Sequence, residues 1–200
     1  MNIHRVTRFW LFGIAVVGSL IAWRGVWAQS QAPEYRPPGD IPPLSPLRAA
    51  GAAPEQSAGR WTSGSSMGFL GSTPDGTALA LNGDLDYHVT DQFSVGPLVQ
   101  VGVTDDMTQV GLSGQGKYGI PIPGTQGRGK FTLQGGMGFI HSDFLHNDTS
   151  WLVPLGAGYE YALESGVDLT ATSLVNITDL HTGAGTGADV MPGFAVGVRF

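Results

Sequence analysis

Charged side chains recur at alternate positions in several segments of the chain, in a pattern suited to ion pairing. In "GDLDYH", for example, Asp84 and Asp86 are separated by one residue. Side chains two apart on a strand point to the same face. If that face is enclosed, carboxylates and cations should pair, because an isolated buried charge is costly. The charged residues expected on this face are Arg60, Asp84, Asp86, Lys117, Lys130, Glu160, Asp168 and Arg199.

Three short motifs resemble catalytic sites but lack the context that such sites need. "GSSMG", residues 64–68, fits the G-x-S-x-G pattern, yet Ser66 falls in a predicted strand and no strand–turn–helix unit surrounds it. "GAGTGA", residues 183–188, lacks the third glycine of a dinucleotide loop and the following helix, and we expect a flexible external loop. His141 and Ser142 are adjacent, so on a strand they point to opposite faces. The sequence therefore predicts no enzyme and no catalytic residue.

Aspartates and histidines gather in the turns at one end of the predicted strands. Carboxylates and imidazoles bind divalent cations, but no spacing here matches a known site. We predict no metal site and no cofactor, and expect that divalent cations bridge these side chains loosely to phosphate groups outside the protein. These residues are Asp75, Asp105, Asp106, Asp143, Asp148, Asp179, Asp189, His141, His146 and His181.

Residues 1–28 have the three parts of a secretory signal peptide. "MNIHRVTR" is cationic, fifteen apolar residues follow, and "VWA" ending at Ala28 is a small-x-small cleavage site. The apolar run is short for a spanning helix, which needs about 20 residues; an uncleaved anchor is the alternative. Cleavage removes three of the ten basic residues and no acidic one, which changes the formal charge from −6 to −9. Such an acidic chain is a poor partner for nucleic acid.

Residues 29–59 are rich in proline and show no hydrophobic period. This composition predicts a disordered or polyproline-like linker that acts as a spacer. The chain has no cysteine, so it contains neither disulfides nor a lipoprotein acylation site.

From residue 60 to residue 200 the hydrophobic period is two. In "TALALNGDLDYHVT", residues 77–90, the odd positions from 79 are mostly large and apolar, and the even positions are polar or small. The alternation occurs eight times, in predicted strands of roughly ten to fourteen residues, the length that a tilted strand needs to cross a bilayer. The fold class predicted is all-β, an eight-stranded antiparallel up-and-down transmembrane β-barrel spanning residues 60–200.

A soluble barrel with an apolar interior is the alternative fold. It would need a charged exterior, but only 13% of the residues are charged, and the polar face is rich in Ser, Gly and Ala. Aromatic residues also fall near both sets of strand ends, as in the interfacial girdles of membrane barrels. One set contains Trp61, Tyr87, Phe93, Tyr118, Phe131, Tyr159, Tyr161 and Phe200, and the other contains Phe69, Phe139 and Trp151.

The chain ends on "FAVGVRF", in which Phe194, Val196, Val198 and Phe200 alternate with small or charged residues. This pattern resembles the small eight-stranded outer-membrane barrels of the OmpA-transmembrane, OmpX and OmpW kinds. The resemblance implies a Gram-negative-type outer membrane and recognition of this last strand by the barrel-insertion machinery. Pro97, Pro154 and Pro192 depart from the pattern; we expect bulges there or strands that begin later.

With an even number of strands, the first and the last residue of the barrel lie on the same side of the membrane. The resemblance implies that this side is the periplasm. The charged residues of the lumen then share its periplasmic half, where we predict an ion-pair plug. The expected role is structural or interactive, with lipid, lipopolysaccharide and an unknown surface partner. A narrow porin or a transporter of small hydrophobic molecules is the second reading, and a lipid-modifying enzyme is the third.

Overall fold

The structure is a computed structural model that describes residues 57–183 and 186–200. The alternating segments form eight strands that close into one antiparallel barrel, as the sequence predicts. The period of two accounts for this, because each strand keeps one apolar and one polar or small face. The strands are β1 (Trp61–Thr73), β2 (Gly76–His88), β3 (Phe93–Val103), β4 (Thr108–Pro121), β5 (Gly129–Asp143), β6 (Asn147–Ala162), β7 (Asp168–Gly183) and β8 (Thr186–Arg199).

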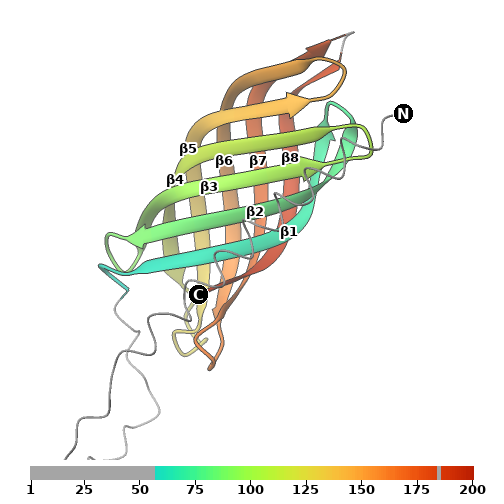
Figure 1. Cartoon of the computed structure of the whole chain (residues 1–200). Coiled ribbons are helices and arrows are strands. Elements are labelled where there is room, and N and C mark those ends of the chain that lie inside the picture. The colour runs from blue at the N-terminus through green and yellow to red at the C-terminus, as the bar shows by residue number, and fades with distance from the viewer. Residues whose placement is uncertain (1–56, 184–185) are drawn as a thin grey trace, which may run out of the picture. The chain divides into compact units, whose positions relative to one another are not determined.

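Each strand pairs with its neighbour in sequence, and β8 pairs with β1 to close the barrel. The seam runs from Gly64 opposite Arg199 to Leu70 opposite Gly193. Figure 1 shows the tilted strands around the barrel, with the last part of β7 and the first part of β8 at the end opposite the C terminus. The charged ends of β2, β4, β6 and β8 therefore share the end of the barrel at which the chain stops.

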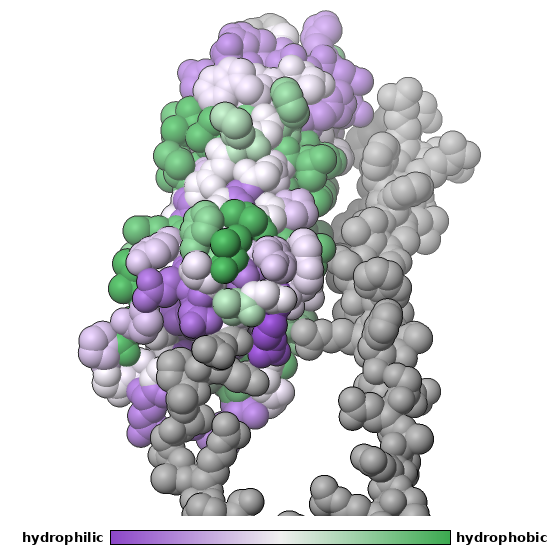
Figure 2. Space-filling view, turned by 90° about the vertical axis from the view of Figure 1, so that its left-hand side faces the viewer, coloured by the Kyte–Doolittle hydropathy of each residue, from purple (hydrophilic) through white to green (hydrophobic). Residues whose placement is uncertain are grey.

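The apolar face of the strands is the outer one. Leu79, Leu85 and Val99 are 46%, 39% and 39% exposed, whereas Asp86 on the alternate face is completely buried. This polarity is the reverse of a soluble barrel. Figure 2 shows patches of hydrophobic residues on the visible barrel face, with hydrophilic ones at its upper end and again in its lower part.

The prediction of bulges or of later strand starts at the three prolines is wrong, because β3, β6 and β8 begin well before them and no register shift occurs there. Pro97 pairs with Gly114, Pro154 with Asn176 and Pro192 with Val175, all without a change of register. On the other side of the strand, pairing to the second neighbour is interrupted at Pro97 and Pro154, and it ends at Pro192. Proline lacks one N–H donor, so these strands lose contact on one side only and keep their register.

The register shifts lie instead near the hairpin tips. They occur between Leu70 and Thr73 in β1, between Ile177 and Leu180 in β7, and again between His181 and Gly183. The flexible external loop predicted at residues 183–188 is shorter than expected, because β7 ends at Gly183 and β8 begins at Thr186. The β5–β6 connection is reduced to residues 144–146.

Most of the predicted signal peptide and linker lies outside the described residues. Residues 57–59 of the predicted linker are described: Asp91 Oδ1 accepts hydrogen bonds from the amides of Ser57 and Ala58, and Gly59 N donates to His88 O. In the described part of the chain, no helix is long and apolar enough to cross a membrane.

Candidate functional site in the barrel lumen

Five of the predicted plug residues meet inside the barrel. Asp84 and Asp86 lie near the end of β2, Lys117 near the end of β4, Glu160 near the end of β6, and Arg199 at the end of β8. All five point inward, because each occupies the polar phase of its strand. Up-and-down topology brings the ends of even-numbered strands to the same end of the barrel, which explains why residues so distant in sequence converge.

Lys117 bridges the two aspartates of β2. Its Nζ lies 2.8 Å from Asp84 Oδ2 and 2.8 Å from Asp86 Oδ2. The side chains of Lys117 and Asp86 are 7% and 0% exposed, so water screens this contact little. Such a cation must be paired to stay buried and charged.

Arg199 connects the same aspartates to the opposite wall. Its Nη2 lies 3.2 Å from Asp84 Oδ2 and 3.2 Å from Asp86 Oδ2, and its Nη1 lies 2.6 Å from Glu160 Oε1. The guanidinium group presents several donors in one plane and can contact three carboxylates at once. The ion network, defined as Asp84, Asp86, Lys117, Glu160 and Arg199, therefore spans the lumen from β2 to β6.

The other three predicted plug residues stand outside this network. Lys130 pairs in register with Glu160, and Asp168 with Arg199, so both border it. Neither makes an ion pair within 4.0 Å to a described residue. Arg60 immediately precedes β1 and is exposed, and its backbone O accepts a hydrogen bond from His88 N.

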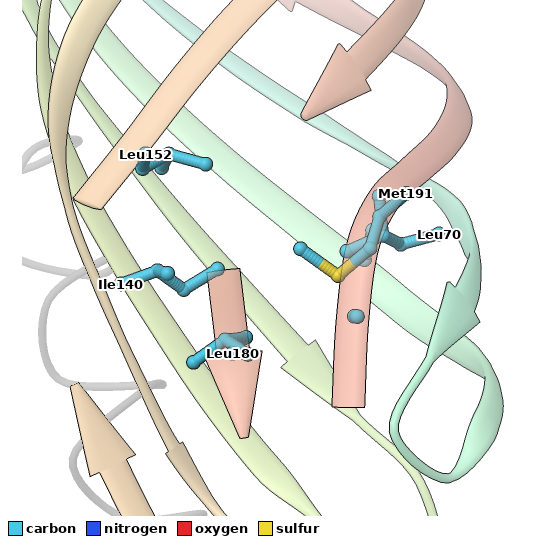
Figure 3. Close-up of a cluster of buried hydrophobic side chains, with 7 residues drawn as sticks. Leu70, Ile140, Leu152, Leu180 and Met191 are labelled. Atoms are coloured by element: carbon cyan, nitrogen blue, oxygen red, sulfur yellow. The ribbon is translucent and has the colours of Figure 1, made fainter. Parts of the chain in front are cut away.

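An apolar cluster occupies the opposite half of the lumen, and the sequence analysis missed it. Leu152 and Met191 are completely buried, and Leu70, Ile140 and Leu180 join them from other strands, with Ile140 close to Leu180 in the view of Figure 3. The complete apolar cluster is Leu70, Ala80, Ile140, Leu152, Leu180, Ala188 and Met191. A signal existed in the sequence, because Ile140, Leu152 and Leu180 occupy inward positions beside outward Phe139, Trp151 and Asp179.

Polar side chains fill the lumen between the network and the apolar cluster. Asn176 is completely buried, and neither its Oδ1 nor its Nδ2 has a hydrogen-bond partner among the described residues. The side-chain oxygens of Gln100, Gln109 and Gln115 are likewise buried and unpartnered within the described part. Buried polar atoms are normally hydrogen-bonded, and this band separates the ion network from the apolar cluster.

The predicted C-terminal signature forms the outer face of β8. Phe194 lies opposite Phe69 across the seam, with ring centroids 6.3 Å apart. Val196 and Val198 face Met67 and Ser65 of β1. Phe200 N donates to Ser63 O at 2.8 Å, and Ser63 N donates to Phe200 O at 3.1 Å. The last residue thus takes part in barrel closure.

At the end where β1 meets β2, contacts between hairpins organise the rim. Thr104 Oγ1 donates to Asp75 Oδ2, and so joins the β3–β4 turn to the β1–β2 turn. Asp148 Oδ2 accepts from the His181 amide at 2.7 Å, which joins the β5–β6 hairpin to the β7–β8 hairpin. Among the described residues no three histidine, aspartate or glutamate side chains cluster as a metal site.

Comparison with known proteins identifies the fold. No family model and no curated protein sequence match the chain. The crystal structure of Neisserial surface protein A (NspA) matches with a TM-score of 0.54 at 12% identity, over 70% of this chain and 94% of that chain. The N-terminal β-barrel domain of Pseudomonas aeruginosa OprF gives 0.47 at 14%, over 70% and 97%. The outer membrane enzyme PagL gives 0.44 at 11%, over 70% and 98%. The chain therefore has the fold of a small eight-stranded outer-membrane barrel.

Proposed function

We propose that this protein is a closed outer-membrane barrel with a structural or surface-interaction role and no enzymatic activity. The observation that carries the proposal is the closure of the lumen by two different layers, the ion network at one end and the apolar cluster at the other. An eight-stranded barrel has room inside only for side chains or one small ligand. The side chains of the ion network and of the apolar cluster occupy this space.

The outer face supports placement in a bilayer. It carries exposed apolar side chains on all eight strands and cross-strand aromatic pairs such as Trp61 with Tyr87, whose ring centroids lie 5.1 Å apart. A water-facing surface of this kind would aggregate, whereas lipid accepts it. The proposed route is secretion by the cleaved signal peptide of residues 1–28, followed by insertion through recognition of Phe194, Val196, Val198 and Phe200.

We assign the surface-interaction role to the external rim, which is the end of the barrel where β1 is connected to β2 and β5 to β6. Leu145 is exposed by more than half at the tip of the β5–β6 hairpin, and the hairpin is tied to its neighbour through Asp148 and His181. A tip held in this way presents a fixed surface to a partner. Lipid and lipopolysaccharide are the proposed contacts of the barrel below it.

Planar-bilayer recording of the purified protein tests the closure. The expected result is no stepwise conductance, with a general porin in the same membrane as the positive control. Replacement of Lys117 by Ala should also leave the barrel silent, because the apolar cluster stays in place. Reproducible open steps from the unaltered protein would refute the closed barrel and support the narrow porin.

Experiments with a deletion strain test the proposed structural and surface-interaction role. A strain without this protein should become more sensitive to SDS, and the unaltered gene should restore resistance. Replacing residues 144–146 by Gly-Asn-Gly should abolish the surface role while the barrel still shows heat-modifiable migration on SDS gels. Turnover of labelled lipid A by the purified barrel would contradict the proposal and favour the enzyme.

A further inference from the structure

The apolar cluster crosses the lumen from wall to wall. Met191 of β8 reaches β4, the strand opposite in the ring, where Gln109 Nε2 donates to its Sδ at 3.6 Å. Leu152 of β6 also reaches β4, because its Cδ2 lies 3.1 Å from the point that a Cβ on Gly111 would occupy. Both Leu152 and Met191 are completely buried. Side chains from two strands therefore extend across the interior to a third.

The cluster offers nothing to which an ion could bind. Ile140, Leu152 and Leu180 carry only hydrocarbon side chains and are at most 1% exposed. An ion that enters such a layer loses its water and gains no polar partner, which is costly. Constrictions of this composition stop ions in channels because they exclude water, and they are called hydrophobic gates.

The end of the lumen that holds the ion network is different, because it has room for water. A cavity of about 30 Å³ is lined by Asn82, Asp84 and Arg199, among others, and one water needs roughly 10–15 Å³. Arg199 Nε is a buried donor and Asn82 Oδ1 a buried acceptor, and neither has a partner among the described residues. A water molecule suits both atoms. The side chain of Asp84 is also 14% exposed, so this layer is open to hydration.

We propose that the apolar cluster alone is the barrier to ions, and that the ion network is a hydrated charged layer that would select cations. In the network three carboxylates face two cations, which leaves one surplus negative charge. A path opened through the cluster should therefore favour potassium over chloride. This inference rests on the closed barrel proposed above, and it names which of the two layers closes it.

Two double variants separate the polarity of the cluster from its size. Leu152→Ser with Leu180→Ser, and Leu152→Ala with Leu180→Ala, remove nearly the same volume, but only serine supplies hydroxyl groups that bind water. In planar bilayers with potassium chloride we expect stepwise currents from the serine pair and none from the alanine pair. The control is Leu155→Ser, on the outer face of the same strand β6, which should stay silent. Heat-modifiable migration on SDS gels shows first that each variant is folded, and Leu180→Ser alone replaces the serine pair if that pair does not fold.

The charge of the network should set the selectivity of the opened path. With different concentrations of potassium chloride on the two sides, the reversal potential of the serine pair should lie toward the potassium equilibrium potential. Adding Asp84→Asn makes the network neutral and should move the reversal potential toward zero. The matched control is Asp189→Asn, which removes the same charge from an exposed position on β8 and should leave it unchanged.

Several results would overturn the proposal. Steps from Lys117→Ala, in which the apolar cluster is intact, would make the ion network the barrier. Equal steps from the serine and alanine pairs would show that size and not polarity closes the path, and a silent but folded serine variant would show that another layer does. A reversal potential on the chloride side would contradict the role of the network. Steps from the unaltered protein would instead refute the closed barrel itself, so the two proposals fail by different results.

Discussion

Arg199 Nη1 lies 2.6 Å from Glu160 Oε1, across the lumen from β8 to β6. Arg199 is the last residue of the last strand, and the next residue, Phe200, is hydrogen-bonded to Ser63 of β1. One short segment therefore closes the wall of the barrel through its backbone and crosses the interior through a side chain. Closure of the barrel and formation of the ion network are thus coupled.

Replacing Arg199 by Met should strongly destabilise the barrel. The substitution leaves Asp84, Asp86 and Glu160 with only Lys117 as a cation in the network. Removing one partner of a buried ion pair typically costs about 3–5 kcal/mol, because the remaining charge is uncompensated. Equilibrium unfolding in urea, followed by tryptophan fluorescence in lipid vesicles, measures this loss.

The matched control is Arg128→Met. Arg128 Nη2 also contacts a glutamate, Glu164 Oε1, at 3.0 Å, but this exposed pair joins the residue before β5 to the turn between β6 and β7. Exposed pairs contribute little to stability, so no measurable change is expected. Equal losses in the two variants would mean that the network adds nothing beyond a surface ion pair.

Much of the fold could be predicted from the sequence because the alternation of large and small side chains determines the faces of each strand. Leu79, Leu85 and Val99 point outward as predicted. The convergence of Asp84, Asp86, Lys117, Glu160 and Arg199 followed from the same alternation together with up-and-down topology. The strand faces and the convergence of the charged residues could be predicted because both depend on local patterns that a single sequence displays.

Features that depend on several strands at once were not predictable. The apolar cluster joins one or two residues from each of six strands, and no single segment reveals it. The effect of the three prolines on strand pairing could not be predicted. A missing hydrogen bond can lead either to a bulge or to a strand that pairs on one side only at that point. Arg60 shares the alternation of β1 but precedes its first residue, and the start of a strand is the least certain part of such a prediction.

The apolar cluster should contribute as much stability as a soluble core. Leu152→Ala removes a side chain that is completely buried in the lumen. Such truncations cost about 2–5 kcal/mol when the cavity cannot collapse. Leu155→Ala, on the outer face of the same strand, is the control and should cost less, because lipid chains fill the space. The same urea titration compares the two, and a larger loss in Leu155→Ala would contradict an apolar core inside the barrel.

If the barrel spans a bilayer, a charge placed on its outer face should lower the free energy of unfolding. The loss should be larger near the middle of the membrane than near its surface. Leu81 lies near the middle of β2 and points outward. Leu81→Arg should cost about 2–4 kcal/mol in vesicles, and Val89→Arg, just beyond the strand end, about 0–1 kcal/mol. Equal costs at the two positions would argue that β2 does not cross the hydrocarbon.

The seam between β1 and β8 depends on glycine at position 68. A Cβ built on Gly68 would lie 1.8 Å from Phe194 O and 2.6 Å from Ala195 Cα, both backbone atoms of the partner strand. Backbone on the paired strand cannot move aside without breaking the ladder, so Gly68→Ala should cost about 3 kcal/mol, the upper end of the usual overpacking penalty. Gly83 is the control, because a Cβ there meets no atom within 4 Å. Gly83→Ala should migrate as a folded, heat-modifiable barrel on SDS gels, whereas Gly68→Ala should show a larger unfolded fraction. If both variants fold equally well, the close approach at the seam does not limit closure.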